Sequence, residues 1–216
     1  MTRKEVRARV EEIGIIPAVR VASEEDAVFA AESVFHGGIG VVELTMTIPG
    51  AFEVIAKLAR TTPSLIVGAG TVLDLHTARR CLDAGAAFLT SPSLDLGIVE
   101  FGAEQDALVI PGALTPTEVA AAARAGADLI KIFPCSQVGG PSYIRALKAP
   151  FAHLSLMASG GVLPQSGVEY IRAGAVALGI GNYLIPPDAV RAKNEKWIRE
   201  LCIRFLGVIR EARALL

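Results

Sequence analysis

The feature of this sequence that most constrains its fold is a short motif that ends a helix and at once begins a strand. It occurs as Ala84-Gly-Ala-Ala-Phe88, as Ala125-Gly-Ala-Asp-Leu129 and as Ala173-Gly-Ala-Val-Ala177. Glycine suits the left-handed position after a helix, and the apolar residues that follow are typical of a buried strand. Strand ends recur roughly every 20–25 residues, so strands and helices alternate along the chain.

This alternation predicts eight strand–helix units preceded by one extra helix. The expected strands are 15–21, 41–46, 65–70, 87–91, 107–111, 128–134, 153–158 and 176–180. The expected helices are 3–13, 23–37, 49–60, 74–85, 95–104, 115–126, 141–148, 165–172 and 187–214. Buried strands that alternate strictly with helices favour a parallel sheet with the helices outside.

Eight such units favour an α/β fold with one domain over residues 1–216, a (β/α)8 TIM barrel with an extra N-terminal helix. An open doubly wound sheet is the alternative. It fits less well, because no Gly-x-Gly-x-x-Gly turn follows the first strand.

Composition narrows the class of protein. The chain is 52% hydrophobic and 20% charged, with a net charge of −1, which gives no reason to expect nucleic acid or an anionic membrane as a partner. The first residues lack the apolar core of a signal peptide, and no segment approaches the ~18 apolar residues of a membrane span. Three cysteines without metal-like spacing indicate a reduced, cytoplasmic protein.

Lys131 is the most informative single residue. It lies in the middle of the apolar stretch Asp128-Leu-Ile-Lys-Ile-Phe-Pro134, where an ammonium group would be poorly solvated. Desolvation favours the free amine, which attacks a ketone to form a Schiff base. The alternatives are a lysine paired with a buried carboxylate, or one whose ammonium reaches water at the end of the strand.

The active site of such a barrel lies where the strands end at their carboxyl termini. Burying charged groups there is costly unless they pair or take part in chemistry, so an ion-pair network that only stabilises the barrel is the alternative. Glycine-rich loops after the last two strands commonly hold a phosphate on backbone N–H groups. The residues at the strand ends are Arg20, Glu43, Gly70-Thr71, Ser91-Pro92, Lys131, Phe133, Ser159-Gly-Gly161 and Gly179-Ile-Gly-Asn182.

These motifs resemble a known family. The stretch Gly126–Pro134, with Gly139 beyond it, resembles the Schiff-base lysine signature of the 2-keto-3-deoxy-6-phosphogluconate and 4-hydroxy-2-oxoglutarate aldolases, and Gly38–Thr45 resembles their second signature. Other landmarks follow in the family's order, namely Gly68-Ala-Gly-Thr-Val72, Ser91-Pro92, Pro111-Gly112 and Ser159-Gly-Gly161. The resemblance covers about residues 12–185. It implies a class I pyruvate aldolase on a (β/α)8 barrel, homotrimeric and cytoplasmic, without metal or other cofactor.

The resemblance also implies roles for single residues. Lys131 would be the Schiff-base nucleophile and Glu43 the general acid and base. Arg20 and Thr71 would contact the pyruvyl carboxylate or neighbouring oxygens, and Phe133 would pack against the pyruvyl group. The other residues that it places at the substrate are Thr47, Pro92 and Ser159, and, at the phosphate end, Gly160, Gly161, Gly181 and Asn182.

The sequence departs from the family at the substrate-facing ends. Thr47 stands where many members have an arginine that contacts the substrate, and Asn182 stands where many have serine. Ala158-Ser159 replaces a frequent proline–threonine pair, and Cys135 occupies a position where small residues are usual. Lys131 and Glu43 are retained, which predicts conserved aldol chemistry with a substrate range that these changes affect.

The leading hypothesis is cleavage of 2-keto-3-deoxy-6-phosphogluconate into pyruvate and glyceraldehyde 3-phosphate. The alternatives within the class are 4-hydroxy-2-oxoglutarate, cleaved to pyruvate and glyoxylate, and the galactonate epimer of the phosphorylated substrate. An alternative of another class is a barrel that binds a phosphorylated sugar acid without turnover. The expected partner in each case is a small 2-keto acid, and exchange of the pyruvate methyl protons separates the aldolase from the binder.

Overall fold

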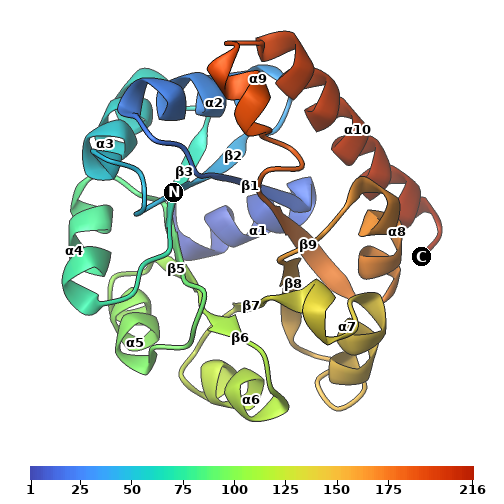
Figure 1. The fold of residues 1–216 in the computed structure, drawn as a ribbon. Helices are drawn as coiled ribbons and strands as arrows, with labels where there is room; N and C mark the ends of the chain where they lie inside the picture. Colours follow the sequence, from blue (N-terminus) through green and yellow to red (C-terminus); the bar gives the residue numbers. More distant parts are fainter.

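The computed structural model describes residues 1–216 and forms a nearly closed barrel of parallel strands surrounded by helices (Figure 1). The order of the strands in the sheet is β5-β4-β3-β2-β1-β9-β8-β7-β6. Their bounds are β1 Ile15–Val19, β2 Val41–Thr45, β3 Ile66–Gly70, β4 Phe88–Thr90, β5 Leu108–Ile110, β6 Gly112–Ala113, β7 Leu129–Ile132, β8 Ser155–Ser159 and β9 Ala175–Ile180. The predicted parallel barrel is confirmed.

The barrel closes through a strand that is interrupted at Pro111. β5 pairs with β4 on one side of this residue, and β6 pairs with β7 on the other. The strand predicted over 107–111 is confirmed as β5, Leu108–Ile110. The short strand β6 was not predicted, and it follows Pro111, a residue without an N–H group to donate to the ladder. The carbonyl of Pro111 still accepts a 2.9 Å hydrogen bond from the backbone N–H of Lys131, which ties this segment to β7.

Helices cover the outside of the barrel between successive strands (Figure 1). Their bounds are α1 Arg3–Ile13, α2 Glu24–His36, α3 Ala51–Thr61, α4 Leu75–Asp83, α5 Leu96–Glu104, α6 Pro116–Arg124, α7 Pro141–Lys148, α8 Pro164–Arg172, α9 Pro187–Arg191 and α10 Glu195–Ala214. A short 3-10 helix, η1, spans Cys135–Val138. Gly85, Gly126 and Gly174 follow helices with φ of 98°, 93° and 106°, as the repeated motif predicted.

The C-terminal helix predicted over 187–214 is two helices. α9 ends at Arg191, Lys193 adopts a left-handed conformation with φ 47°, and Asn194 begins α10 by accepting a hydrogen bond from the backbone N–H of Trp197. The single-helix prediction was therefore wrong. The turn lets α9 pack on α2 while α10 packs on α8 and α2.

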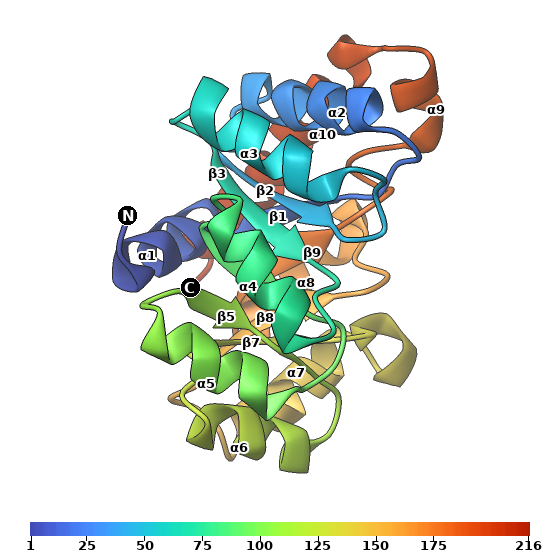
Figure 2. The ribbon, with the colours of Figure 1, turned by 90° about the vertical axis from the view of Figure 1, so that its left-hand side faces the viewer.

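The extra N-terminal helix lies at the end of the barrel where the strands begin (Figure 2). Thr2 and Glu5 form a capping box at its start. Arg3 forms an ion pair with Asp128, just before β7, and Arg7 donates a 3.1 Å hydrogen bond to Ser155, the first residue of β8. α1 therefore covers the amino-terminal end of the barrel and leaves the opposite end open.

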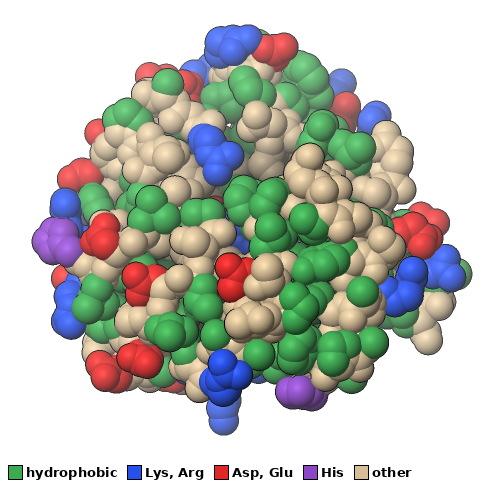
Figure 3. All heavy atoms as spheres, turned by 60° about the horizontal axis from the view of Figure 1, so that its bottom comes forward, with side chains coloured by type: hydrophobic (Ala, Val, Ile, Leu, Met, Phe, Trp, Pro, Cys, Tyr) green, Lys and Arg blue, Asp and Glu red, His purple; other side chains and the backbone are tan.

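The interior is one continuous cluster of buried hydrophobic side chains that extends from Val6 in α1 to Ala212 in α10. None of the helices is both long enough and apolar enough to cross a membrane. On the face of the molecule in Figure 3, Lys and Arg side chains are scattered among hydrophobic and polar ones and do not form a large basic patch.

Candidate active site

A cavity of about 250 Å³ opens at the carboxyl ends of the strands. It collects side chains and backbone from strands that are far apart in the sequence. The predicted site residues that line it are Arg20, Glu43, Thr71, Pro92, Lys131, Phe133, Ser159, Gly160, Gly161, Gly181 and Asn182. The structure thus brings together all the predicted site residues except Thr47.

Lys131 is held by strands on both sides. β7 pairs it with Gly112 of β6 and with Met157 of β8, and its side chain is only 8% exposed. No ion pair of the chain includes Lys131, so the alternative of a lysine paired with a buried carboxylate was wrong. The nitrogen Nζ lies 5.4 Å from the centre of the Phe133 ring, and Lys131 lines the cavity.

Glu43 lies in the middle of β2 and is 3% exposed. It too forms no ion pair, and Oε2 accepts a 2.8 Å hydrogen bond from the hydroxyl of Thr90, the last residue of β4. Because β3 lies between β2 and β4, the Glu43 side chain crosses an intervening strand to reach Thr90.

The glycines of β3 make this crossing possible. A Cβ atom at Gly70 would overlap the carboxyl group of Glu43, and one at Gly68 would overlap the Phe88 ring. Any larger residue at Gly70 would occupy the space of the carboxylate. Gly68 and Gly70 therefore leave a strand surface without side chains, on which the carboxyl group of Glu43 lies.

Thr71, directly after β3, has a left-handed backbone with φ 59°. This conformation costs a non-glycine residue of order 1 kcal/mol or more and is concentrated at functional sites. The backbone N–H of Thr71 donates to no other backbone group. Thr71 therefore presents a free backbone N–H and a hydroxyl at the cavity wall, and both groups can donate hydrogen bonds to the carboxylate of a ligand.

Two glycine loops form the opposite wall. Gly160 and Gly161, after β8, have φ of 85° and 78°, and Gly181 and Asn182 follow β9. None of these four backbone N–H groups donates to a backbone carbonyl. At Gly161 a Cβ atom would overlap the hydroxyl of Ser136. Unused amides on two adjacent loops form a site suited to an anion.

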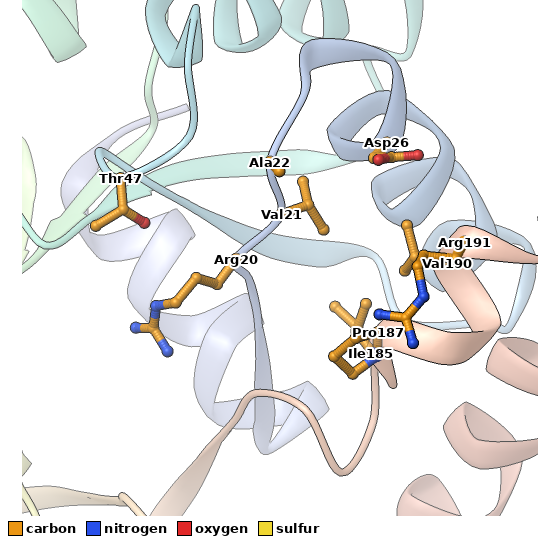
Figure 4. Close-up of a pocket in the computed structure, with 9 residues that line it drawn as sticks. All are labelled: Arg20, Val21, Ala22, Asp26, Thr47, Ile185, Pro187, Val190 and Arg191. Carbon is orange, nitrogen blue, oxygen red and sulfur yellow. The ribbon is translucent and has the colours of Figure 1, made fainter.

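Thr47 lies in a second cavity, of about 520 Å³, which adjoins the first and shares Arg20 with it. Figure 4 shows Thr47 and Arg20 on one side of this cavity, with Val190 and Arg191 of α9 on the other. The Thr47 hydroxyl lies 2.7 Å from that of Thr45, and Thr45 donates to the carbonyl of Val19. Thr47 thus has a short side chain, lies on the same side of this second cavity as Arg20, and lines it.

Two other residues that the sequence singled out, Cys135 and Ser91, lie outside the cavity lining. Cys135 is fully buried, and burial raises the pKa of its thiol to about 11, which makes it unreactive near neutral pH. Ser91 donates its hydroxyl to the carbonyl of Ser93, so it stabilises the turn after β4 and does not line the cavity.

Sequence reasoning missed several residues at the site. Thr90 contacts Glu43, and its only signal was its spacing of two from the buried Phe88, which places both on one face of the strand. Tyr183 stands at the cavity rim and is 53% exposed. Ala18, Val162, Gly179 and Ile180 also line the cavity.

Two named relatives match this chain over most of their own length. The chain is 28% identical over 200 residues to a 2-dehydro-3-deoxy-phosphogluconate aldolase of Treponema pallidum, covering 93% of this chain and 95% of the relative. It is 31% identical over 187 residues to a KHG/KDPG aldolase of Escherichia coli, covering 87% and 88%.

Solved structures show the same architecture. A KDPG aldolase from Legionella pneumophila, with pyruvate captured as a covalent carbinolamine intermediate, has a TM-score of 0.83 and 29% identity, covering 88% of this chain and 92% of the other. A structure described as native KDPGal has a TM-score of 0.85 and 27% identity, with coverage of 93% and 96%. The sequence model of the family described as "Aldolase: KDPG and KHG aldolase" matches residues 6–201. The resemblance, the barrel and the class of enzyme predicted from the sequence are thereby confirmed, and the chain belongs to the KDPG and KHG aldolase family.

Proposed function

We propose that this aldolase cleaves 2-keto-3-deoxy-6-phosphogluconate to pyruvate and glyceraldehyde 3-phosphate through an imine on Lys131. One observation carries the proposal. A buried lysine without an ion pair reaches a cavity that also holds the Glu43 carboxylate and the unused amides of the glycine loops. Nucleophile, proton carrier and anion site are the three components that this reaction needs.

The chemistry follows from these components. Nζ of Lys131 attacks the C2 carbonyl, and loss of water from the carbinolamine leaves an iminium ion. Glu43 takes the proton of the C4 hydroxyl, and the C3–C4 bond breaks. The electron pair of this bond forms the C2–C3 double bond, and the C=N π pair moves to the iminium nitrogen. The products are the aldehyde and an enamine. Glu43 then returns a proton to C3 of the enamine, and hydrolysis releases pyruvate and the lysine.

The pyruvyl group would lie between Thr71 and Phe133. The free amide and hydroxyl of Thr71, together with Arg20, would bind the C1 carboxylate through charge-assisted hydrogen bonds. The partly buried Phe133 ring would pack against the methyl carbon. This arrangement would place C2 at the amine and C3 and C4 beside Glu43.

The glycine loops support a phosphorylated substrate over 4-hydroxy-2-oxoglutarate. Four backbone amides without backbone acceptors suit the several oxygens of a phosphate better than one distal carboxylate. The name of the Escherichia coli relative covers both substrates, so the unphosphorylated one is the second candidate. The galactonate epimer differs only at C4, and the same cavity residues would bind its carboxylate and phosphate.

The test is a comparison of kcat/KM for the gluconate, galactonate and 4-hydroxy-2-oxoglutarate substrates, with inorganic phosphate as a competitor. The proposal predicts the highest value for the phosphorylated gluconate and competitive inhibition by phosphate. A higher value for 4-hydroxy-2-oxoglutarate, without inhibition by phosphate, would favour the second candidate. Binding of the phosphorylated acid without exchange of pyruvate methyl protons would instead support a barrel that binds without turnover.

We also propose that the enzyme is a cytoplasmic homotrimer that acts on a small molecule. The family resemblance supports this assembly. Light scattering coupled to size-exclusion chromatography tests it, and a monomer at micromolar concentration would contradict it.

A further inference from the structure

We infer that Thr90 is the positioning residue for Glu43: its hydroxyl holds the carboxylate in place across β3, with the second oxygen beside Gly70. The inference rests on the proposed function, in which Glu43 carries protons. The contact that supports it is the 2.8 Å hydrogen bond from Thr90 Oγ1 to Glu43 Oε2.

The surroundings give Glu43 no other support. The structure contains no ion pair to Glu43, and Thr90 is its only hydrogen-bond partner within the chain. Thr90 is 1% exposed and Glu43 is 3% exposed, so water cannot readily replace the hydroxyl. A bond to a charged acceptor in such a site is among the stronger hydrogen bonds of a protein.

The position of Thr90 is fixed independently of its hydroxyl. Its backbone carbonyl accepts a 3.1 Å hydrogen bond from the N–H of Val72, and β4 pairs Thr90 with Ile110 of β5. β4 is therefore held by β5 on one side and by Val72, just after β3, on the other. The hydroxyl is a donor on a rigid strand, whereas the glutamate side chain has three rotatable bonds.

The chemical consequence concerns both oxygens of the carboxylate. Thr90 donates to Oε2, which leaves Oε1, beside Gly70, as the oxygen that exchanges protons with the substrate. In the imine of pyruvate, the base takes a methyl proton, the C–H electron pair forms the C2–C3 double bond of the enamine, and the C=N π pair moves to nitrogen.

Two pairs of variants isolate the hydroxyl. Thr90→Val removes it at nearly constant volume, and Thr90→Ser keeps it. Thr90→Ala and Thr90→Ser then form a second pair that differs only in the hydroxyl, so the test survives if Thr90→Val fails to fold. Thr45→Val is the matched control, because the buried Thr45 hydroxyl contacts Val19 and Thr47 and has no bond to Glu43.

The measurement is the exchange of pyruvate methyl protons with D2O at neutral pH, alongside trapping of the imine with borohydride. The expected result for Thr90→Val and Thr90→Ala is an intact Lys131 adduct with about ten-fold slower exchange. Thr90→Ser is expected to restore the rate. A purely structural loss would lower trapping of the imine together with the exchange rate.

Three outcomes would overturn the inference. Variants without the hydroxyl that keep the native exchange rate would show that Thr90 does not position Glu43. The same loss of rate in Thr45→Val would show a general effect of losing a buried hydroxyl. Absence of any imine in the native protein would overturn the proposed function as well, whereas an imine with an unchanged exchange rate in Thr90→Val and Thr90→Ala would overturn only the role of Thr90.

Discussion

Gly70 lies directly beneath the carboxyl group of Glu43, so closely that a methyl group at position 70 would occupy the place of the carboxylate. This relationship connects an unremarkable glycine in β3 to the proton chemistry of the site. We expect Gly70→Ala to displace Glu43 and slow exchange of pyruvate methyl protons by about 100-fold, while the imine at Lys131 still forms.

Gly207→Ala is the control for this variant. Gly207 lies within α10, and a Cβ atom there would meet nothing within 4 Å. Alanine in a helix interior is favoured by about 0.5–1 kcal/mol over glycine, so this variant should be slightly more stable and fully active. Native exchange in Gly70→Ala would contradict the placement of Glu43 over β3.

The glycine loop after β8 should govern affinity for the phosphorylated part of the substrate. We expect Gly161→Ala to raise KM for the phosphorylated substrate by about ten-fold, because the backbone at φ 78° is strained by a side chain and the methyl group would press on Ser136. KM for pyruvate in the exchange reaction should change little. Steady-state kinetics on both reactions provide the comparison.

Gly126→Ala separates the strain of the backbone from the loss of the anion site. Gly126 also has a left-handed backbone, with φ 93°, but a Cβ atom there would meet nothing within 4 Å. Both variants should lose stability from backbone strain, and only Gly161→Ala should lose affinity. An equal rise of KM in both would refute a specific role of the glycine loop.

Thr47→Arg should place a further guanidinium near Arg20 in the cavity of about 520 Å³, which Arg191 also lines. An added cation near the predicted carboxylate site should lower KM for pyruvate in the exchange reaction by about five-fold at low ionic strength. The effect should weaken as salt is added. Thr47→Gln adds length without charge, and an equal gain in this control would show that charge is not the cause.

The sequence was sufficient to predict the barrel because its repeated helix-ending glycines and apolar strands are local signals. It was insufficient where the local pattern is too short or is interrupted by one turn. The strand β6 was missed because Gly112 and Ala113 are too few to show a strand periodicity. Lys193 and Asn194 interrupt an amphipathic pattern that otherwise indicates one helix.

The site was predictable to the extent that strand ends converge. Lys131 and the glycine loops were found because each lies at a strand end and matches a motif. Thr90 was missed because its contact with Glu43 crosses β3 and depends on the absence of a side chain at Gly70. Thr47 is close in sequence to Glu43, but the turn after β2 carries it into the neighbouring cavity.

The link between α2 and the turn after α9 should make stability depend on pH. Lys193 donates a 2.8 Å hydrogen bond to Asp26, and this bond holds the pKa of Asp26 below its usual value of 3.8. A lowered pKa in the folded state stabilises the protein above pH 3.8, and this contribution disappears as the pH falls through the lowered pKa.

Asp26→Asn should therefore lower Tm by about 1–2 °C at neutral pH, as expected for a surface pair, and the difference should vanish in acid. Glu25→Gln, at the more distant carboxylate 3.2 Å from Lys193, should have a smaller effect. Thermal unfolding at several pH values measures both. A difference that persists below pH 3 would point to a cause other than the charge of Asp26.

The most direct test of the central claim is the mass of the intact protein after incubation with pyruvate and borohydride. The expected result is a single reduced adduct on the native protein, located at Lys131 by peptide mapping and absent from Lys131→Met. An adduct that persists in Lys131→Met, or its absence from the native protein, would contradict the assignment of Lys131 as the Schiff-base nucleophile.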